Sequence, residues 1–161
     1  MYARGFTLIE FIVVMAIVGI LVSLASPSIV RFTAGSEVRS IAASVVGDIG
    51  LARAEALRTR GAVTICARAT DTTCGSDWTK GWLIFVDTNG NQSLDAGERL
   101  IRNQEELGGR ATLIGPTSFL FRSTGAVATG GIFELRRTYA DGRDIQVFPG
   151  GRVTSTVVPL P

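Results

Sequence analysis

The chain opens with an unbroken apolar run. Among residues 6–26 the only charged side chain is that of Glu10. At 1.5 Å per residue, about 20 such residues form a helix long enough to cross the hydrocarbon core of a bilayer. We therefore expect a membrane-spanning helix over residues 6–27. The positive Arg4 before the run predicts that this end stays in the cytoplasm and that the rest of the chain lies outside it.

A helical stripe of apolar residues follows the run. These residues recur at steps of three and four, with the charged residues largely off the stripe: Val38, Ile41, Ala42, Val45, Ile49, Ala52 and Ala56. Gly61 ends the pattern as a C-cap signal. The sequence predicts one long helix, membrane-spanning over 6–27 and amphipathic over 28–61, which Pro27 kinks or locally breaks. Two separate helices joined at residues 26–28 are the alternative.

After Gly61 the apolar period shortens to that of a strand. Short apolar runs punctuated by Gly, Asn, Asp, Ser and Pro predict strands over residues 62–67, 81–87, 99–103, 110–114, 118–122, 131–137, 144–148 and 152–155. The last five residues, VVPLP, are expected to be irregular. One helix followed by regularly spaced strands predicts an α+β fold, in which residues 62–161 form an antiparallel β-domain packed on the helical stripe.

Composition argues against catalysis. The chain has 161 residues, a formal net charge of +2, a single lysine and no histidine. The commonest general base and the commonest metal ligand are therefore missing. The sequence also contains no nucleophile elbow and no phosphate-cradling loop. We expect a protein that is not an enzyme and that uses no cofactor.

The two cysteines, Cys66 and Cys74, are eight positions apart. If the soluble part of the chain lies outside the cytosol, it lies in an oxidising compartment, where such a pair closes a short loop as a disulfide. Two free thiols are the alternative.

The residues around Glu10 resemble a known processing site. GFTLIE, residues 5–10, followed by an apolar run resembles the start of type IV prepilins and type II secretion pseudopilins. The resemblance implies that residues 1–5 are a leader peptide, that a prepilin peptidase cleaves between Gly5 and Phe6, and that the new Phe6 amine is methylated. Phe11, where Leu is more usual, is the departure from the pattern.

The resemblance suggests a role for Glu10 that agrees with its chemistry. An ammonium at Phe6 and a carboxylate at Glu10 are each costly in lipid, and each offsets the desolvation of the other when they pair. The resemblance implies a pair between neighbouring subunits, which sets their axial register in a fibre. A pair within one helix, which the i to i+4 spacing allows, and a protonated Glu10 are the alternatives.

A second, looser resemblance covers most of the chain. The cysteine pair, the pattern W-x-x-GW-x-x-F-x-D from residue 78, the Asn- and Gly-rich hairpin ending in GE, and the later SFLFRSTGAV, GIFEL and GGRV resemble minor pilins of the GspH/FimT/FimU group. The resemblance implies a pilin fold and a single-pass protein of the bacterial inner membrane with a periplasmic β-domain, later part of a fibre.

Three functions follow from this group. The first is a structural minor pilin that initiates or caps a type IV pilus, with other pilins, the prepilin peptidase and the inner membrane as partners. The second is a GspH-type minor pseudopilin of a type II secretion system. The third is a FimT-like receptor pilin that binds double-stranded DNA during DNA uptake.

One loop has the oxygen spacing of a calcium site. Residues 87–98 place oxygen-bearing side chains at the positions that a twelve-residue calcium loop uses: Asp87, Asn89, Asn91, Ser93, Asp95 and Glu98. However, Gln92 stands where such loops carry Gly, and a strand is expected to precede the loop. Asn-Gly and Ala-Gly are also ordinary hairpin chemistry. We favour a solvated hairpin without metal.

Arginines near the C-terminus form a candidate DNA-binding set, because arginine contacts phosphates without reading sequence: Arg136, Arg137, Arg143 and Arg152. FimT-type pilins carry a GRxR-like motif, which GGRVTS matches only at Gly151 and Arg152. Acidic neighbours dilute the charge, and a solvated strand face is the interpretation that we favour. For Trp78 and Trp82 we favour a place in the core over an exposed stacking surface.

Overall fold

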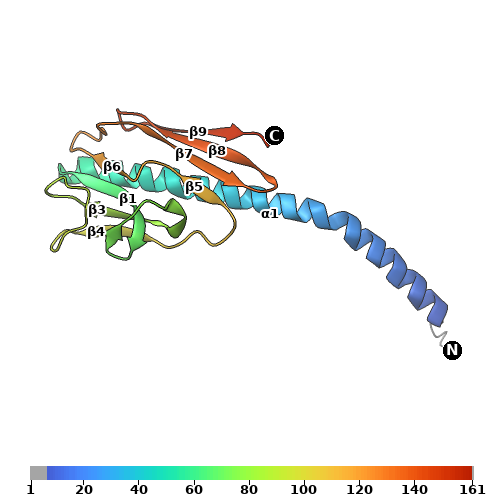
Figure 1. Cartoon of the computed structure of the whole chain (residues 1–161). Coiled ribbons are helices and arrows are strands. Elements are labelled where there is room, and N and C mark those ends of the chain that lie inside the picture. The colour runs from blue at the N-terminus through green and yellow to red at the C-terminus, as the bar shows by residue number, and fades with distance from the viewer. Residues whose placement is uncertain (1–6, 161) are drawn as a thin grey trace, which may run out of the picture.

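The structure is a computed structural model that describes residues 7–160 and, for residues 22–27 within that range, the backbone alone. Helix α1 spans Leu8–Thr59. The prediction of one long helix is confirmed, and the alternative of two helices joined at residues 26–28 is wrong because the helix continues through them. The first part of α1 projects away from the rest of the molecule, and its second part lies along the strands (Figure 1).

The second part of α1 buries the stripe that the sequence predicts. All seven stripe residues are buried, and Ala34 extends the stripe by one turn towards the N-terminus. They belong to a single apolar core together with residues from both β-sheets. The spacing of three and four residues keeps them on one face of the helix, and that face is the one that the strands cover.

The C-terminus of α1 differs from its prediction by one residue. Arg60, with φ of 52°, occupies the left-handed cap position that we assigned to Gly61. Gly61 therefore lies after the cap, and strand β1 begins at Val63.

Within residues 7–160 the strands form two antiparallel sheets. The first sheet has the order β2-β1-β3-β4, with β6 also paired to β1. Its strands are β1 (Val63–Thr70), β2 (Thr73–Cys74), β3 (Trp82–Val86), β4 (Leu100–Gln104) and β6 (Ser118–Phe121). The second sheet has the order β5-β7-β8-β9, with β5 (Thr112–Ile114), β7 (Gly131–Arg137), β8 (Ala140–Val147) and β9 (Val153–Val158). Helix α1 lies alongside both (Figure 1).

All eight predicted strands exist; β7 has the predicted bounds, and the ends of the other seven are shifted. The largest shift is in β8, which starts at Ala140 rather than at residue 144. The reversal before it is made at Thr138 and Tyr139, with Tyr139 at a φ of 68°, so Asp141 and Gly142 lie inside the strand. A side chain at position 142 would meet the Leu135 carbonyl and the Arg136 side chain, which explains a glycine within a strand.

The longer β8 also lengthens β9. Gly142 and Arg143 pair with Val158 and Val157. The expectation that the last five residues are irregular is therefore wrong for these two valines, and the strand ends only before Pro159. The short β2 was not predicted, because its two residues pair only after the chain has turned back on β1.

The disulfide and the tryptophan core are confirmed. Cys66 and Cys74 are joined, with their sulfur atoms 2.06 Å apart, and they belong to a small second apolar cluster with Leu83 and Phe85. Trp78 and Trp82 are fully buried, and their rings lie 6.3 Å apart. The short helix η1 (Trp78–Lys80) carries Trp78 into the main core just before β3 starts.

Candidate assembly interface

The projecting part of α1 is an apolar helical arm, residues 8–21. Its large apolar side chains are about half exposed or more, from 46% for Val18 to 80% for Leu8. Glu10 is the only charged residue in it. A contiguous apolar surface of this kind marks a site that another molecule covers. By length and hydropathy, none of the helices formed by the described residues qualifies as a membrane span.

Glu10 takes part in a capping box with Thr7 at the start of the arm. Its backbone N–H donates to Thr7 Oγ1 (3.3 Å), and its Oε2 accepts from the backbone N–H of Thr7 (3.1 Å) and from Thr7 Oγ1 (3.2 Å). The box satisfies N–H groups that have no partner within the helix, and it places a carboxylate at the positive end of the helix dipole.

The sequence analysis missed Thr7 as a partner of Glu10. The spacing of a Thr and a Glu three residues later, just before an apolar run, is the signal that could have found it. Gly5 and Phe6 lie outside the described residues. Cleavage between them and the pair between the Phe6 amine and Glu10 therefore remain predictions.

Two glutamates of α1, each hydrogen-bonded to arginine, attach the helix to the strands. Glu37 accepts from Arg137 Nε (2.9 Å) and from the backbone N–H groups of Arg110 (3.1 Å) and Ala111 (3.3 Å). The hydrogen bond from Arg137 is the main reason why the pKa of Glu37 lies below its ordinary value. This one side chain therefore ties the helix both to β7 and to the start of β5.

Glu55, near the C-terminus of α1, also accepts hydrogen bonds from arginine side chains. It accepts from Arg58 in a bidentate pair (2.6 and 2.7 Å) and from Arg99 next to β4. These hydrogen bonds, that from Arg58 first, lower the pKa of Glu55 from 4.5 to about 2. Between the two glutamates, the buried Asp48 accepts from Trp82 Nε1 (2.8 Å) and pairs with Arg102 (3.2 Å). The second part of α1 is therefore fixed to both sheets, and the arm extends from a rigid base.

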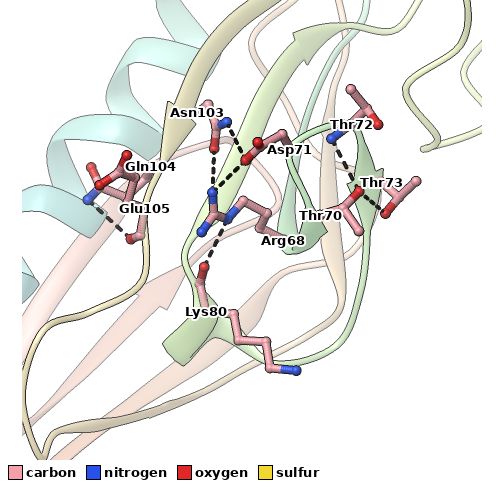
Figure 2. A network of polar contacts seen from close by, with 9 residues as sticks. All are labelled: Arg68, Thr70, Asp71, Thr72, Thr73, Lys80, Asn103, Gln104 and Glu105. Atoms are coloured by element: carbon pink, nitrogen blue, oxygen red, sulfur yellow. Dashed lines mark hydrogen bonds and ion pairs between the residues drawn. The ribbon is translucent and has the colours of Figure 1, made fainter.

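A polar network fixes the disulfide hairpin to the edge of the first sheet. Arg68 Nε donates to the Lys80 carbonyl (3.0 Å), and Arg68 Nη1 donates to Asp71 (2.8 Å) and to Asn103 (3.3 Å). Asn103 in turn donates to Asp71 (3.1 Å), which closes a triangle of side chains from β1, its turn and β4 (Figure 2). The hairpin is thus held by a covalent bond and by this network.

The carboxylate oxygens of the loop over residues 87–98 already accept hydrogen bonds from within the protein. Asp87 is buried and accepts from Thr64 Oγ1 (2.7 Å) and from the backbone N–H groups of Asn91 and Gln92. Asp95 Oδ2 accepts from Asn89 and Asn91, which lowers its pKa.

Glu98 and Ser93 differ in their hydrogen bonds within the loop. Glu98 accepts from backbone N–H groups at both ends of the loop, whereas Ser93 donates its own N–H to Asn91. Among the described residues, no three His, Cys, Asp or Glu side chains gather as a metal site would require.

The four arginines of the candidate DNA-binding set do not form one patch. Arg136 pairs with Asp144 (2.7 Å) and Glu134 (3.5 Å), and Arg137 pairs with Glu37. The Arg143 guanidinium donates to the Ser155 hydroxyl (3.4 Å), and the Arg143 carbonyl accepts from Arg136 Nη1 (3.2 Å). Arg152 lies at the other end of β8, where its guanidinium stacks over the Phe148 ring at 4.3 Å. The residues that lie together are therefore mostly neutralised, and Arg152 is apart from them.

A long helix with an exposed apolar arm, a lone acid near its start and antiparallel sheets packed on its second half is the architecture of a pilin. The sequence matches two family profiles: that of the type II transport protein GspH over residues 42–151, and that of the prokaryotic N-terminal methylation motif over residues 1–26. The first match spans more than half of the chain. The chain therefore belongs to the GspH family, whose members are structural pilins and pseudopilins.

Solved structures share this fold. The type IV minor pilin FimU of Pseudomonas aeruginosa superimposes with a TM-score of 0.62 at 24% identity, over 80% of this chain and 92% of FimU. The minor pseudopilin EpsH of the type 2 secretion system of Vibrio cholerae superimposes with a TM-score of 0.55 at 13% identity, over 75% and 97% of the two chains. Both likenesses confirm the predicted pilin fold.

A curated relative is closer in sequence but matches over a shorter part. The pilin-like protein PilA1 of Thermus thermophilus is 34% identical over 100 residues, which is 61% of this chain. The chain spans 57% of the length of that relative. The family match over residues 42–151 confirms the predicted membership of the minor pilin and pseudopilin group.

Proposed function

We propose that this protein is a minor pilin that initiates or caps a type IV pilus through packing of its apolar arm. The observation that carries the proposal is the exposed arm with a single carboxylate, held on a rigid base by Glu37 and Glu55. Burying apolar surface yields roughly 25 cal/mol per Å², so arms that pack together gain free energy over their whole length.

The arm has two successive environments in this proposal. After cleavage between Gly5 and Phe6, residues 6–27 anchor the subunit in the bacterial inner membrane, with the β-domain in the periplasm. The apolar run of residues 6–26 supports this step. The subunit then leaves the membrane for the fibre, where neighbouring arms replace the lipid.

Glu10 provides the selectivity of the second step. Among the described residues, Thr7 contacts only Oε2 of its carboxylate. The carboxylate is therefore oriented by Thr7 while it keeps capacity to accept the methylated Phe6 amine of a neighbouring subunit. Such a pair neutralises both charges in an apolar surrounding and fixes the axial register of the two arms.

The test compares variants of Glu10 in fibres sheared from cells. Glu10→Ala and Glu10→Gln should reach the membrane in normal amounts and should be absent from the fibre fraction. Ile12→Ala, a matched change in the same arm, should still be incorporated. Normal incorporation of Glu10→Gln, which keeps the shape and loses the charge, would contradict the pairing.

The second candidate is a GspH-type pseudopilin of a type II secretion system. The family match and the superposition on EpsH favour it. The two candidates differ in partners rather than in the physics of the arm. Complementation separates them: the gene should restore pilus formation to a strain that lacks its minor pilins, and a pseudopilin should instead restore exoprotein secretion.

A further inference from the structure

Two unpartnered charge clusters flank the second part of α1 on opposite sides. The first is an arginine groove of about 400 Å³ between α1 and the β8–β9 edge of the second sheet, lined by Arg31, Arg39, Arg143, Tyr139 and Leu160. None of the three arginines pairs with a carboxylate within residues 7–160. Asp141 also lines the groove, and its Oδ1 accepts from the Leu160 N–H. The net charge of the lining is therefore positive.

The second cluster is an acidic flank made by Glu105 and Glu106 just after β4. Both residues are exposed, and neither carboxylate has a partner in the part of the chain that the structure describes. The contact drawn at Glu105 in Figure 2 ends on its backbone oxygen. Glu106 lines a groove of about 240 Å³ together with Glu37, whose charge Arg137 neutralises.

The helix itself places the two clusters on opposite flanks at similar heights. The α1 residues that line the acidic side include Glu37, Ser40 and Ser44, and those that line the arginine groove include Gly35 and Arg39. At about 100° per residue, these two sets point to roughly opposite sides of the helix. The exposed ridge of α1 lies between them.

We propose that the arginine groove of one subunit receives the acidic flank of a second copy of this chain. The inference rests on the proposed function, because side-by-side subunits with their arms together bring opposite flanks into contact. The contact joins two different surfaces of the two copies, so it is heterologous. Complementary charge selects the partner and sets its orientation.

Two other occupants fit the arginines less well. Arg31 and Arg39 are separated by roughly 12 Å along the helix axis, so they follow a ridge on a neighbour rather than one plane of lipid headgroups. Duplex DNA would meet a groove whose third arginine contacts Ser155 and which also holds Asp141. We therefore commit to the protein occupant, and the experiment distinguishes the others.

The test is site-directed cross-linking of the full-length chain in cells. The two native cysteines are joined in the disulfide, so Gly35→Cys in the arginine groove and Gly108→Cys on the acidic side supply the only free thiols and leave the charges in place. Two differently tagged chains, one with each variant, should be joined by a short bismaleimide in both membrane and fibre fractions. Gly35→Cys with Gly35→Cys should give about tenfold less product, as should Arg60→Cys with Gly108→Cys, because Arg60 lies at the far end of α1.

Charge reversal tests the chemistry of the contact. The readout is the bismaleimide product between Gly35→Cys on the groove side and Gly108→Cys on the acidic side, both of which leave the charges in place. Arg39→Glu in the first chain should lower the product by about tenfold, because like charges then face each other. Glu106→Arg in the partner chain should restore it.

Other results of the cross-linking experiment would each overturn one part of the proposed contact. Equal cross-linking between identical positions would overturn the heterologous contact, and products formed only with other pilins would overturn the second copy as occupant. A DNA gel shift that Arg39→Glu abolishes, without any cross-link, would assign the groove to nucleic acid. Normal incorporation into fibres without a cross-link overturns the flank contact alone, whereas failure of the wild type to enter fibres contradicts the proposed function.

Discussion

The two parts of α1 are equally helical and differ in what covers them. From Ala34 onwards, apolar residues recur every three to four positions, and the chain's own strands bury them. In the arm, residues 8–21, apolar side chains point in all directions and remain exposed. The periodic pattern predicts which face of the helix packs on the rest of the molecule. The unbroken apolar pattern indicates a helix surface that other molecules cover on every side.

The acidic side chains of the two parts of α1 also differ in whether they have a partner. The acids of the second part, Glu37, Asp48 and Glu55, each have an arginine partner in the chain. The one acid of the arm, Glu10, contacts Thr7 and has no cationic partner among the described residues. The comparison teaches that the acids and the apolar stripe of the second part have partners within the chain, whereas the arm has none among the described strands.

The largest expected difference between the two parts concerns folding stability. Ile49→Ala should lower the free energy of unfolding of the β-domain by about 3 kcal/mol, because it opens a cavity in the core. Ile17→Ala in the exposed arm should leave that free energy unchanged. Chemical unfolding of the full chain in detergent, followed by tryptophan fluorescence, measures both. A large loss from Ile17→Ala would show that the arm packs on the domain after all.

The disulfide should matter for the domain and not for the arm. Replacing both Cys66 and Cys74 by Ala opens a short loop and should cost about 2–3 kcal/mol of domain stability. The network of Arg68, Asp71 and Asn103 should keep the hairpin in place in the folded state. The same unfolding measurement checks the cost, and the arm's helicity by circular dichroism should be unchanged.

The glutamates that buttress α1 make the domain sensitive to acid. The pKa of Glu55 is lowered from 4.5 to about 2, so its charged form stabilises the folded state. Stability from this group is fully present above pH 4.5 and is lost as the pH falls towards 2. Glu37, whose pKa is also lowered, acts in the same direction. The unfolding temperature of Glu55→Gln should therefore fall less than that of the wild type between pH 5 and pH 3.

The smallest expected effect is that of calcium. The carboxylates of Asp87 and Asp95 already accept hydrogen bonds from within the loop. Millimolar calcium should therefore produce no heat in isothermal titration and no change in the unfolding temperature. A rise in that temperature that Asp95→Asn removes would establish a calcium site at this loop.

Local patterns in the sequence predicted what depends on neighbours along the chain. The helical stripe and the strand positions follow from periods of a few residues, and the apolar arm follows from an unbroken apolar run. The capping box of Thr7 and Glu10 has a local signal too, although we did not use it. The ends of β8 and β9 were missed because the Asp-Gly at residues 141–142 has the composition of a turn, while the actual reversal uses Thr138 and Tyr139.

Contacts between distant residues could not be predicted in this way. Glu37 and Arg137 are 100 positions apart, and Asp48 and Trp82 are 34 apart. Their pairing depends on how the two sheets are placed on α1, which a single sequence does not state. The position of Arg152 could not be predicted either: it is close to Arg143 in the sequence but lies at the other end of β8. Pairing between residues that are distant in the sequence therefore determines which charged side chains have an ion-pair partner.

The most direct test of the account is the mass of the N-terminal peptide of the protein recovered from sheared fibres. Cleavage between Gly5 and Phe6 and methylation of the new amine create the cation that Glu10 of a neighbour is proposed to neutralise. We predict that the protein in fibres begins with N-methylated Phe6. Protein that enters fibres with residues Met1 to Gly5 still attached would contradict the central claim.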